Sequence, residues 1–278
     1  MNVELIKSLR AITSAAMSDC KSALQESGWN LEAAVDLIKI RGKAITAKKE
    51  GLATKEGRIL IGKDKFGNLN LVSISSQTDF ASNSEDFIEF CNTVIAALNE
   101  EKDIASVEPQ REALIAKIRE NVEIKRTAKL GAYRDASINR QYLHSNNKIG
   151  VIARFRGSNV AVMDSICCQI AATNPSALNK EGLPKNLVEH QTSIFKQQVA
   201  EMNKPEAAQA GIIAGKLNKW YKEVCLLDQE SVEFPKKTIQ QLCNENNIKV
   251  VEFVRFEVGE GVEVKEKDFA QEVAEMAK

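Results

Sequence analysis

Hydrophobic residues near the N-terminus recur at helical spacing in three short runs. Ile6, Leu9 and Ile12 repeat at three-residue steps, which predicts a first helix. Capping and stop residues bound the next two helices, and these are Ser18, Gly28, Asn30 and Gly42. We therefore expect a three-helix bundle, followed by a basic stretch at 39–58 that is either a solvated linker or a segment facing a partner.

β-forming residues cluster next, at 58–61 and 69–74, on either side of a polar turn at 65–68. Two such runs around a short turn predict a hairpin. A helix is expected to follow, capped by Asn83 or Ser84. Its buried stripe is predicted to consist of Phe87, Ile88, Cys91, Val94 and Ile95.

The same order returns in the second half of the chain. Residues 136–144 and 149–155 flank a Ser-Asn-Asn turn, and a small apolar helix is expected at about 160–172. This repeat predicts an α+β fold with a duplicated core of antiparallel strands. The remaining expected elements are an antiparallel helical hairpin at 187–202 and 206–224, a strand at 248–258 and a helix at 269–278.

Composition and charge narrow the class of protein. Of 278 residues 44% are hydrophobic, and 38 Lys and Arg balance 38 Asp and Glu. The chain is therefore expected to fold, and it lacks the basic field of most nucleic-acid binders. No apolar run approaches the ~18 residues of a membrane span. We expect a cytoplasmic protein that contacts neither a membrane nor nucleic acid directly.

Cysteine and histidine usage argues against metal and hydrolytic chemistry. The six cysteines show no CxxC spacing, and they are Cys20, Cys91, Cys167, Cys168, Cys225 and Cys243. With His144 and His190 as the two histidines, neither a zinc site nor a hydrolytic triad can be drawn. We expect no cofactor, and reduced thiols that are mostly buried, the adjacent pair at 167–168 included. Residues 259–261, Gly-Glu-Gly, are interpreted as a turn, since a lone GxG lacks the lysine of a phosphate loop.

A polar stretch at 75–83 surrounds one large apolar side chain, Phe80. Loops of this composition often carry function. From residue types alone two interpretations stay open: a functional loop, or a helix cap at Asp79 with Phe80 as an anchor in the core.

Three separated motifs resemble the elongation factor Ts family of bacteria. They are Leu9-Arg10 with residues 13–21, Gln77-Thr78-Asp79-Phe80, and Arg255-Phe256-Glu257-Val258-Gly259-Glu260-Gly261. The resemblance runs over the whole chain. It implies a ubiquitin-associated-like helical domain at 1–54, a core N-subdomain at 55–137 and a core C-subdomain at 138–278. The last would contain an inserted helical hairpin at about 180–226 and a C-terminal helical module at about 262–278.

The resemblance also implies a function. It points to a guanine-nucleotide exchange factor of translation elongation, without enzymatic turnover, whose partner is elongation factor Tu in its GDP, nucleotide-free and GTP forms. In the family the Thr-Asp-Phe loop disturbs the Mg²⁺ and phosphate site of that GTPase, which here implies the role for Thr78, Asp79, Phe80 and Ala81. Displacing the support of Mg²⁺ weakens GDP binding without covalent chemistry.

Further contacts with the partner are implied for residues of the helical module and the core, namely Arg10, Met17, Asp19, Lys21 and His144. The chain departs from the family pattern at Ser14, Ala16, Ser18, Ser165 and Gln169. The apolar stripe of the helical hairpin also suggests self-pairing.

Two other classes of protein are weighed against the exchange factor. An adaptor that uses only the helical bundle would leave the loop around Phe80 without a purpose. An RNA-binding protein that uses the basic stretch would lack interleaved surface aromatics for base stacking.

Overall fold

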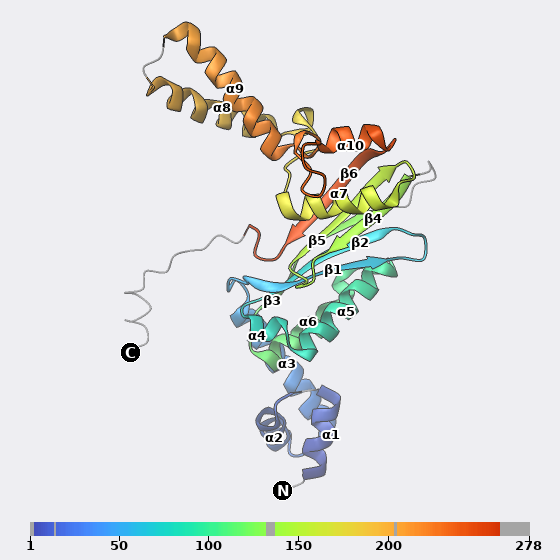
Figure 1. Ribbon diagram of the computed structural model, residues 1–278. Helices are drawn as coiled ribbons and strands as arrows, with labels where there is room; N and C mark the ends of the chain where they lie inside the picture. Colours follow the sequence, from blue (N-terminus) through green and yellow to red (C-terminus); the bar gives the residue numbers. More distant parts are fainter. Residues whose placement is uncertain (1–2, 14, 132–136, 203–204, 262–278) are drawn as a thin grey trace. The chain divides into compact units, whose positions relative to one another are not determined.

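The computed structural model describes residues 3–13, 15–131, 137–202 and 205–261 (Figure 1). The chain divides into two compact units: unit 1 holds Met1–Ile59, Val72–Thr127 and Glu257–Lys278, and unit 2 holds Leu60–Leu71 and Ala128–Phe256. Both units mix helices with strands, which confirms the expected α+β class. The helix expected at 269–278 and the module at 262–278 lie outside the described residues.

Three helices open unit 1: α1 (Val3–Thr13), α2 (Met17–Glu26) and α3 (Leu31–Lys49). Their shared core is small, and Leu9, Leu24 and Ala34 are fully buried in it. Asn30 caps α3 as predicted, because its side chain accepts a hydrogen bond from the Ala33 amide at 3.0 Å. The helical bundle expected from the hydrophobic spacing is confirmed.

The predicted hairpin and the helix behind it are present. The elements are β1 (Glu56–Lys63), β2 (Leu69–Ser76), a one-turn helix α4 (Asp79–Ser82) and α5 (Glu85–Asn99). Ser84 caps α5, since its hydroxyl accepts a hydrogen bond from the Phe87 amide at 3.2 Å. Phe87, Cys91 and Val94 of the predicted stripe are buried, whereas Ile88 and Ile95 are half-buried.

Residues 104–130 form three elements that the hydrophobic pattern does not predict. They are η1 (Ile104–Val107), α6 (Glu108–Ile118) and β3 (Val122–Leu130), which completes a sheet of order β1-β2-β3. In α6 the buried residues are Leu114 and Ile115 alone, so no apolar stripe marks the helix. In β3 both ends are buried, but charged residues dominate between them.

The predicted start of α2 and the predicted end of α3 are wrong. Ser18 does not cap α2, because the helix already begins at Met17 and Ser18 lies in its first turn. Gly42 does not end α3, so about half of the expected linker is helical. The reason is tertiary packing: Gly42 is buried, and a Cβ there would lie 3.7 Å from the Cβ of Ala116 in α6. The helix continues through this glycine because α3 packs along α6, and a single glycine inside a helix costs only about 1 kcal/mol.

Unit 2 repeats the order of hairpin and helix. Strands β4 (Ser137–Leu143) and β5 (Ile149–Arg156) pair antiparallel, with Ser137 opposite Arg156, and β6 (Lys249–Glu257) completes a sheet of order β4-β5-β6. The apolar helix α7 (Val160–Thr173) packs on β4 and β5 and buries Met163, Ile166 and Ile170. The repeat expected from the sequence is therefore present, with a third strand in each half.

The remaining elements of unit 2 are η2 (Lys180–Gly182), α8 (Lys185–Ala200), α9 (Glu206–Val224), η3 (Leu226–Asp228) and α10 (Ile239–Glu245). Helices α8 and α9 pack against each other as the predicted hairpin (Figure 1). Val199 of α8 is buried, and the Lys216 ammonium of α9 lies 5.5 Å from the centre of the Phe195 ring of α8. The apolar positions of the hairpin thus cover one another in part.

Candidate functional site

Among the described residues, the large apolar side chain most open to solvent is Phe80, which is 86% exposed. The interpretation of Phe80 as a core anchor is therefore wrong, and Thr78 rather than Asp79 occupies the N-cap of α4. A single exposed apolar residue is ordinary on a protein surface. What distinguishes Phe80 is how firmly its backbone is held, and we call the segment 78–83 the Phe80 turn.

The start of the Phe80 turn is held by Thr78 and by Glu120, which lies between α6 and β3. The Thr78 hydroxyl accepts a hydrogen bond from the Ala81 amide at 3.2 Å and donates one to Glu120 Oε1 at 2.7 Å. The Thr78 amide donates to the other carboxylate oxygen, Oε2, at 3.0 Å. One carboxylate therefore binds both donors of Thr78, in the stronger class of hydrogen bonds that carry a charge.

The end of the turn is held from β1. Arg58 donates from Nε to the Ser82 carbonyl and from Nη2 to Asn83 Oδ1, both at 2.8 Å. The Asn83 side chain donates back to the Asp79 carbonyl at 2.9 Å, and Ala81 is buried. Of the four residues predicted for this site, Thr78 and Ala81 thus support the turn, while Asp79 and Phe80 face solvent.

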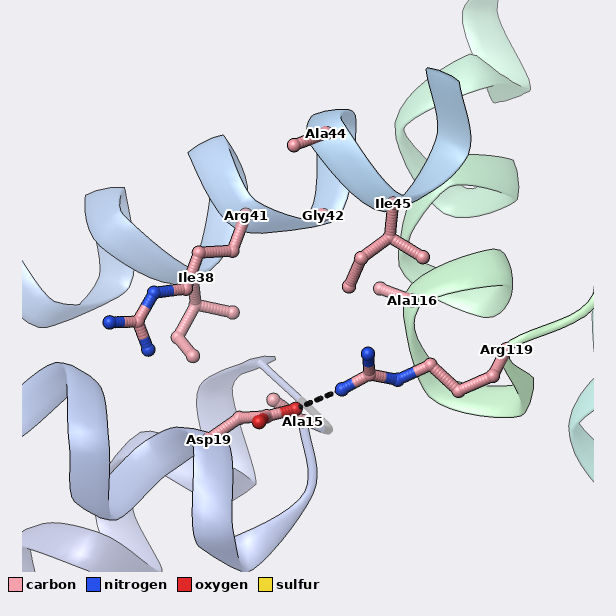
Figure 2. A pocket seen from close by; sticks show the side chains of 9 residues that line it. All are labelled: Ala15, Asp19, Ile38, Arg41, Gly42, Ala44, Ile45, Ala116 and Arg119. Atoms are coloured by element: carbon pink, nitrogen blue, oxygen red, sulfur yellow. Dashed lines mark hydrogen bonds and ion pairs between the residues drawn. The ribbon is translucent and has the colours of Figure 1, made fainter. Parts of the chain in front are cut away.

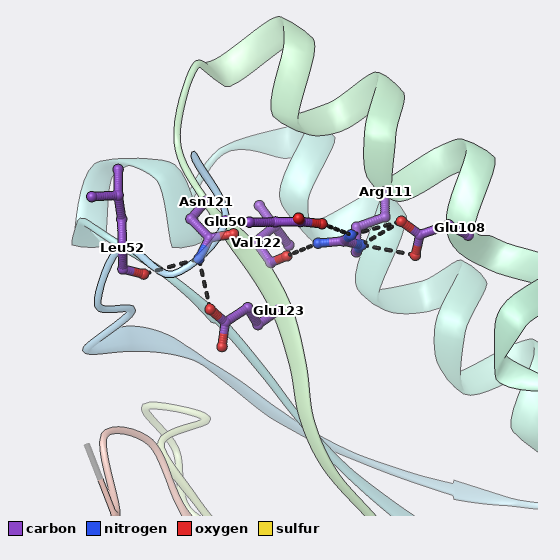
Figure 3. A network of polar contacts seen from close by, with 7 residues as sticks. All are labelled: Glu50, Leu52, Glu108, Arg111, Asn121, Val122 and Glu123. Carbon is purple, nitrogen blue, oxygen red and sulfur yellow. Dashed lines mark hydrogen bonds and ion pairs between the residues drawn. The ribbon is translucent and has the colours of Figure 1, made fainter. Parts of the chain in front are cut away.

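A buried asparagine connects the turn to the rest of unit 1. The Asn121 amide donates to Gln77 Oε1 at 2.9 Å, and its side chain donates to the Leu52 carbonyl at 2.9 Å and to Glu123 at 2.6 Å. The carbonyl of the next residue, Val122, accepts a hydrogen bond from Arg111 at 2.8 Å (Figure 3). The strand that starts here is therefore tied both to the segment after α3 and to the Phe80 turn.

Arg111 also joins two acidic side chains to this network (Figure 3). It binds Glu108 at 2.6 Å and Glu50 at 3.5 Å. Hydrogen bonds from the Arg111 guanidinium to the Glu108 carboxylate raise the pKa of Arg111 above its ordinary value. The end of α3 is thereby anchored to the start of α6.

The residues predicted to contact a partner from the helical module lie on α1 and α2. Arg10 and Lys21 are exposed, and Met17 is 50% exposed. Asp19 is half-buried, and its carboxylate forms an ion pair with Arg119 at 2.6 Å, which Figure 2 shows. Three of the four side chains are therefore open to solvent, whereas Asp19 is engaged within the chain.

The Asp19–Arg119 pair lies in a cavity of about 260 Å³ between α2, α3 and α6 (Figure 2). The lining is mainly small and aliphatic: Ala15, Ile38, Gly42, Ala44, Ile45 and Ala116, with the charged Asp19, Arg41 and Arg119. Arg41 is itself paired with Glu26. The charged groups that line this cavity are thus paired with one another or with a neighbour.

His144 lies in unit 2, at the turn between β4 and β5. Its Nδ1 is 3.0 Å from Asn146 Oδ1, and its amide donates to the Ile149 carbonyl at 2.9 Å. The ring meets Tyr142 edge to face, with centroids 6.4 Å apart. The structure thus places His144 as a half-buried residue of a hairpin turn.

Gln169, one of the departures from the family pattern, has a structural role here. It is buried in α7, and its Nε2 donates to Gln229 Oε1 and to the Glu230 carbonyl, both at 3.2 Å. Its Oε1 accepts a hydrogen bond from the Val232 amide at 2.8 Å. The side chain fastens the segment after η3 to α7, while Ser165 is half-buried.

The cysteines behave as predicted with one exception. All six are free, and five are buried. Burial raises the pKa of Cys91 and of Cys167 to about 12, so both stay neutral thiols near pH 7. Cys168 is exposed, so its assignment to the core is wrong, because on a helix adjacent residues point in different directions.

Within the described ranges of the chain, no three His, Cys, Asp or Glu side chains cluster closely enough to hold a metal ion. Of the helices in the same ranges, none combines the length and the apolarity that crossing a membrane demands. Residues 259–261 form the predicted turn, in which Gly259 and Gly261 have φ of +82° and +75°.

The amino-acid sequence of the chain is similar to two protein families and to several known proteins. The family model described as "Elongation factor TS" matches residues 77–260, and a "UBA-like domain" model matches residues 3–38. The chain is 34% identical over 291 residues to Elongation factor Ts of Thioalkalivibrio sulfidiphilus, covering 100% of this chain and 99% of that protein. It is 38% identical over 283 residues to Elongation factor Ts of Photorhabdus laumondii, covering 99% and 98%.

A third relative, Elongation factor Ts of Clostridioides difficile, is 34% identical over 303 residues, with 100% of this chain and 99% of that protein covered. The UBA-like helical module, the α+β core and these matches define a translation elongation factor. The chain belongs to the elongation factor Ts family.

Proposed function

We propose that the chain is a guanine-nucleotide exchange factor that binds elongation factor Tu and promotes release of GDP and its exchange for GTP. The exposed ring of Phe80 on a turn fixed at both ends carries this proposal. A backbone that is already held in one conformation loses little entropy when the side chain it carries enters a partner. Membership of the elongation factor Ts family supports elongation factor Tu as that partner.

The proposed mechanism is mechanical and electrostatic. Phe80 enters the GTPase as an apolar wedge, and Asp79 offers an exposed carboxylate beside it. Thr78 and Ala81 contribute by holding the turn. Mg²⁺ bridges the nucleotide phosphates and the GTPase, so disturbing its support weakens the binding of GDP.

Acceleration of exchange then follows from linkage. A factor that binds the nucleotide-free GTPase more tightly than its GDP form weakens the binding of GDP by the same ratio. No bond is made or broken on this chain, so it acts without enzymatic turnover and without a cofactor. The same reasoning applies to GTP, and nucleotide supply sets the direction of exchange.

Further contacts with the GTPase come from other parts of the chain. In the helical module the proposed residues are Arg10, Met17, Asp19 and Lys21, and in the core His144. We assign the domains 1–54, 55–137 and 138–278 on the same family plan, and we place the protein in the cytoplasm, where translation elongation takes place.

Self-pairing through α8 and α9 is a separate proposal, and a monomer mass independent of concentration in light scattering would contradict it.

The test is stopped-flow release of a fluorescent GDP analogue from elongation factor Tu of the same organism. Phe80→Ala is expected to lower the accelerated rate roughly 30-fold, which is the order of a hot-spot truncation. Asp79→Ala should give a smaller loss. Phe66→Ala is the matched control, because Phe66 is also exposed, at 59%, but lies in the turn between β1 and β2.

Two outcomes would contradict the proposal. Wild-type chain that leaves the release rate unchanged would rule out exchange activity. Equal losses in Phe80→Ala and Phe66→Ala would rule out the Phe80 turn as the acting element.

A further inference from the structure

We propose that Glu120 is a positioning residue for nucleotide exchange, which holds the Phe80 turn in the shape that presents the ring of Phe80. This inference rests on the proposed function. It concerns a residue that lies 42 positions after Thr78 in the chain and outside every motif of the sequence analysis.

Both oxygens of the Glu120 carboxylate bind Thr78. Oε2 binds the Thr78 amide at 3.0 Å and Oε1 binds the Thr78 hydroxyl at 2.7 Å. Because the hydroxyl proton is engaged in the hydrogen bond to Glu120, a lone pair of the hydroxyl oxygen points to the Ala81 amide and accepts its hydrogen bond. Glu120 therefore fixes the backbone of Thr78 and also orients the Thr78 hydroxyl, which is the N-cap of α4.

Glu120 is itself held from both sides. The preceding residue, Arg119, has a left-handed backbone with φ of +61° and pairs with Asp19 of α2. The following residue, Asn121, is fully buried and is bonded to Gln77 and Leu52. The carboxylate thus projects from an anchored three-residue segment, so binding Thr78 costs it little conformational freedom.

The expected consequence separates binding from exchange. Without Glu120 the Phe80 turn samples more conformations, and the ring must be ordered at the moment it enters the partner. The other proposed contacts are unchanged, so the two proteins still associate. We therefore expect the maximal rate of GDP release to fall while the concentration of factor at half-maximal rate stays the same.

A merely destabilising substitution would behave differently. It would reduce the fraction of folded chain, which raises the total concentration needed for half-maximal rate but leaves the rate at saturation unchanged. Measuring the release rate over a range of factor concentrations therefore distinguishes a positioning role from a loss of folded protein.

The first experiment needs no partner. Chymotrypsin cleaves after exposed aromatic residues, and cleavage of a folded chain follows the population of locally opened states. Cleavage after Phe80, followed by mass spectrometry on the full chain, is expected to be about tenfold faster in Glu120→Ala than in wild type. Glu89→Ala is the matched control, because it removes an exposed carboxylate from α5 of the same unit, and no change is expected.

The second experiment measures exchange with the same variants. Glu120→Ala is expected to lower the maximal rate of GDP release about tenfold. Glu120→Gln should recover most of it, because the amide oxygen can still accept from the Thr78 amide while its NH₂ donates to the hydroxyl. Thr78→Val in the Glu120→Ala background should lower the rate further, since it also removes the hydroxyl that accepts a hydrogen bond from the Ala81 amide.

The outcomes are distinct. Unchanged cleavage after Phe80 in Glu120→Ala, or an unchanged maximal rate, overturns the positioning role. Faster cleavage together with a lower maximal rate and rescue by glutamine supports it. Wild-type chain that fails to accelerate GDP release overturns the proposed function instead, and the cleavage experiment then still decides whether Glu120 holds the turn.

Discussion

The two halves of the core connect the same elements in different ways. In the first half, residues 77–84 join β2 to α5 and include the Phe80 turn. In the second half, residues 157–159 suffice to join β5 to α7. The short connection packs closely: a Cβ at Gly157 would lie 2.6 Å from the Asn247 carbonyl, and Asn159 both caps α7 and binds Asn246 at 2.8 Å.

This difference separates what the fold needs from what the proposed function needs. A strand can enter its helix through three residues, so the longer connection of the first half is no requirement of the architecture. Its extra residues are held by side chains remote in sequence, Arg58 and Glu120, and they present an exposed ring. A duplicated scaffold thus carries a projecting turn in one copy and a plain connection in the other.

The largest expected effect concerns glycines that support the scaffold in each half. A Cβ at Gly57 would lie 2.2 Å from the Ile74 carbonyl oxygen, closer than the 2.6 Å at Gly157. Both positions also have positive φ, at +153° and +121°. Gly57→Ala and Gly157→Ala should each lower the free energy of unfolding by about 3 kcal/mol, with the greater loss at Gly57.

Amide hydrogen exchange is the suitable measurement, because it reports the free energy of opening of each compact unit separately, whereas a single unfolding transition assumes that both units unfold together. The matched control is Gly215→Ala in α9, where a Cβ would meet no atom within 4 Å and φ is not positive. That change should stabilise the helix by about 0.5 to 1 kcal/mol. An unchanged free energy of unfolding in Gly57→Ala would contradict this prediction, because it would mean that β1 and β2 can move apart to admit the Cβ without loss of stability.

An intermediate effect is expected from the arginines that tie each hairpin to the next element of the chain. Arg58 binds the end of the Phe80 turn, whereas Arg140 of β4 binds Asp164 of α7 at 2.6 Å through two nitrogens. Lysine cannot reproduce such a two-pronged contact. Arg58→Lys should lower the protection of the Ser82 and Asn83 amides about fivefold.

Arg140→Lys is the counterpart in the second half. It should leave the protection of residues 82 and 83 unchanged, because its contacts lie on α7. Loss of protection there in Arg140→Lys would mean that the halves are not independently fastened. Amide exchange followed by mass spectrometry or NMR distinguishes the two results.

The smallest expected effect is a pH dependence of the first hairpin alone. Burial by itself would raise the pKa of Asp64, but hydrogen bonds from Asn68 and Phe66 outweigh it and lower the pKa below its ordinary value. The stabilisation is present above about pH 3.9, the ordinary value for aspartate, and is lost as the pH falls through the lowered pKa.

The NMR shifts of the Phe66 and Asn68 amides, each 2.9 Å from Asp64 Oδ1, should report this loss. The Lys148 amide of the second hairpin binds the neutral side chain of Asn146 at 2.9 Å and should not change over the same range. Asp64→Asn should abolish the transition in the first hairpin. A transition that persists in this variant would assign it to another group.

Most local elements and their order could be predicted from the sequence alone. Apolar spacing predicts the helical bundle, α5, α7 and the pair α8 and α9, and clusters of β-forming residues around polar turns predict both hairpins, because these patterns are local to each element. The caps at Asn30 and Ser84 were predictable for the same local reason, since a cap acts within three residues. The polar stretch around Phe80 was also visible as an unusual loop.

Features that depend on distant residues became clear only in the folded chain. Gly42 lies within a helix because α3 packs against α6, and α6 and β3 carry too few buried residues to show a pattern. Whether Phe80 is a core anchor or an exposed ring could not be read locally, because its conformation is set by Arg58 and Glu120. Hydrogen bonds between residues far apart in the chain leave no period in the sequence, and they fix the shape of the candidate site.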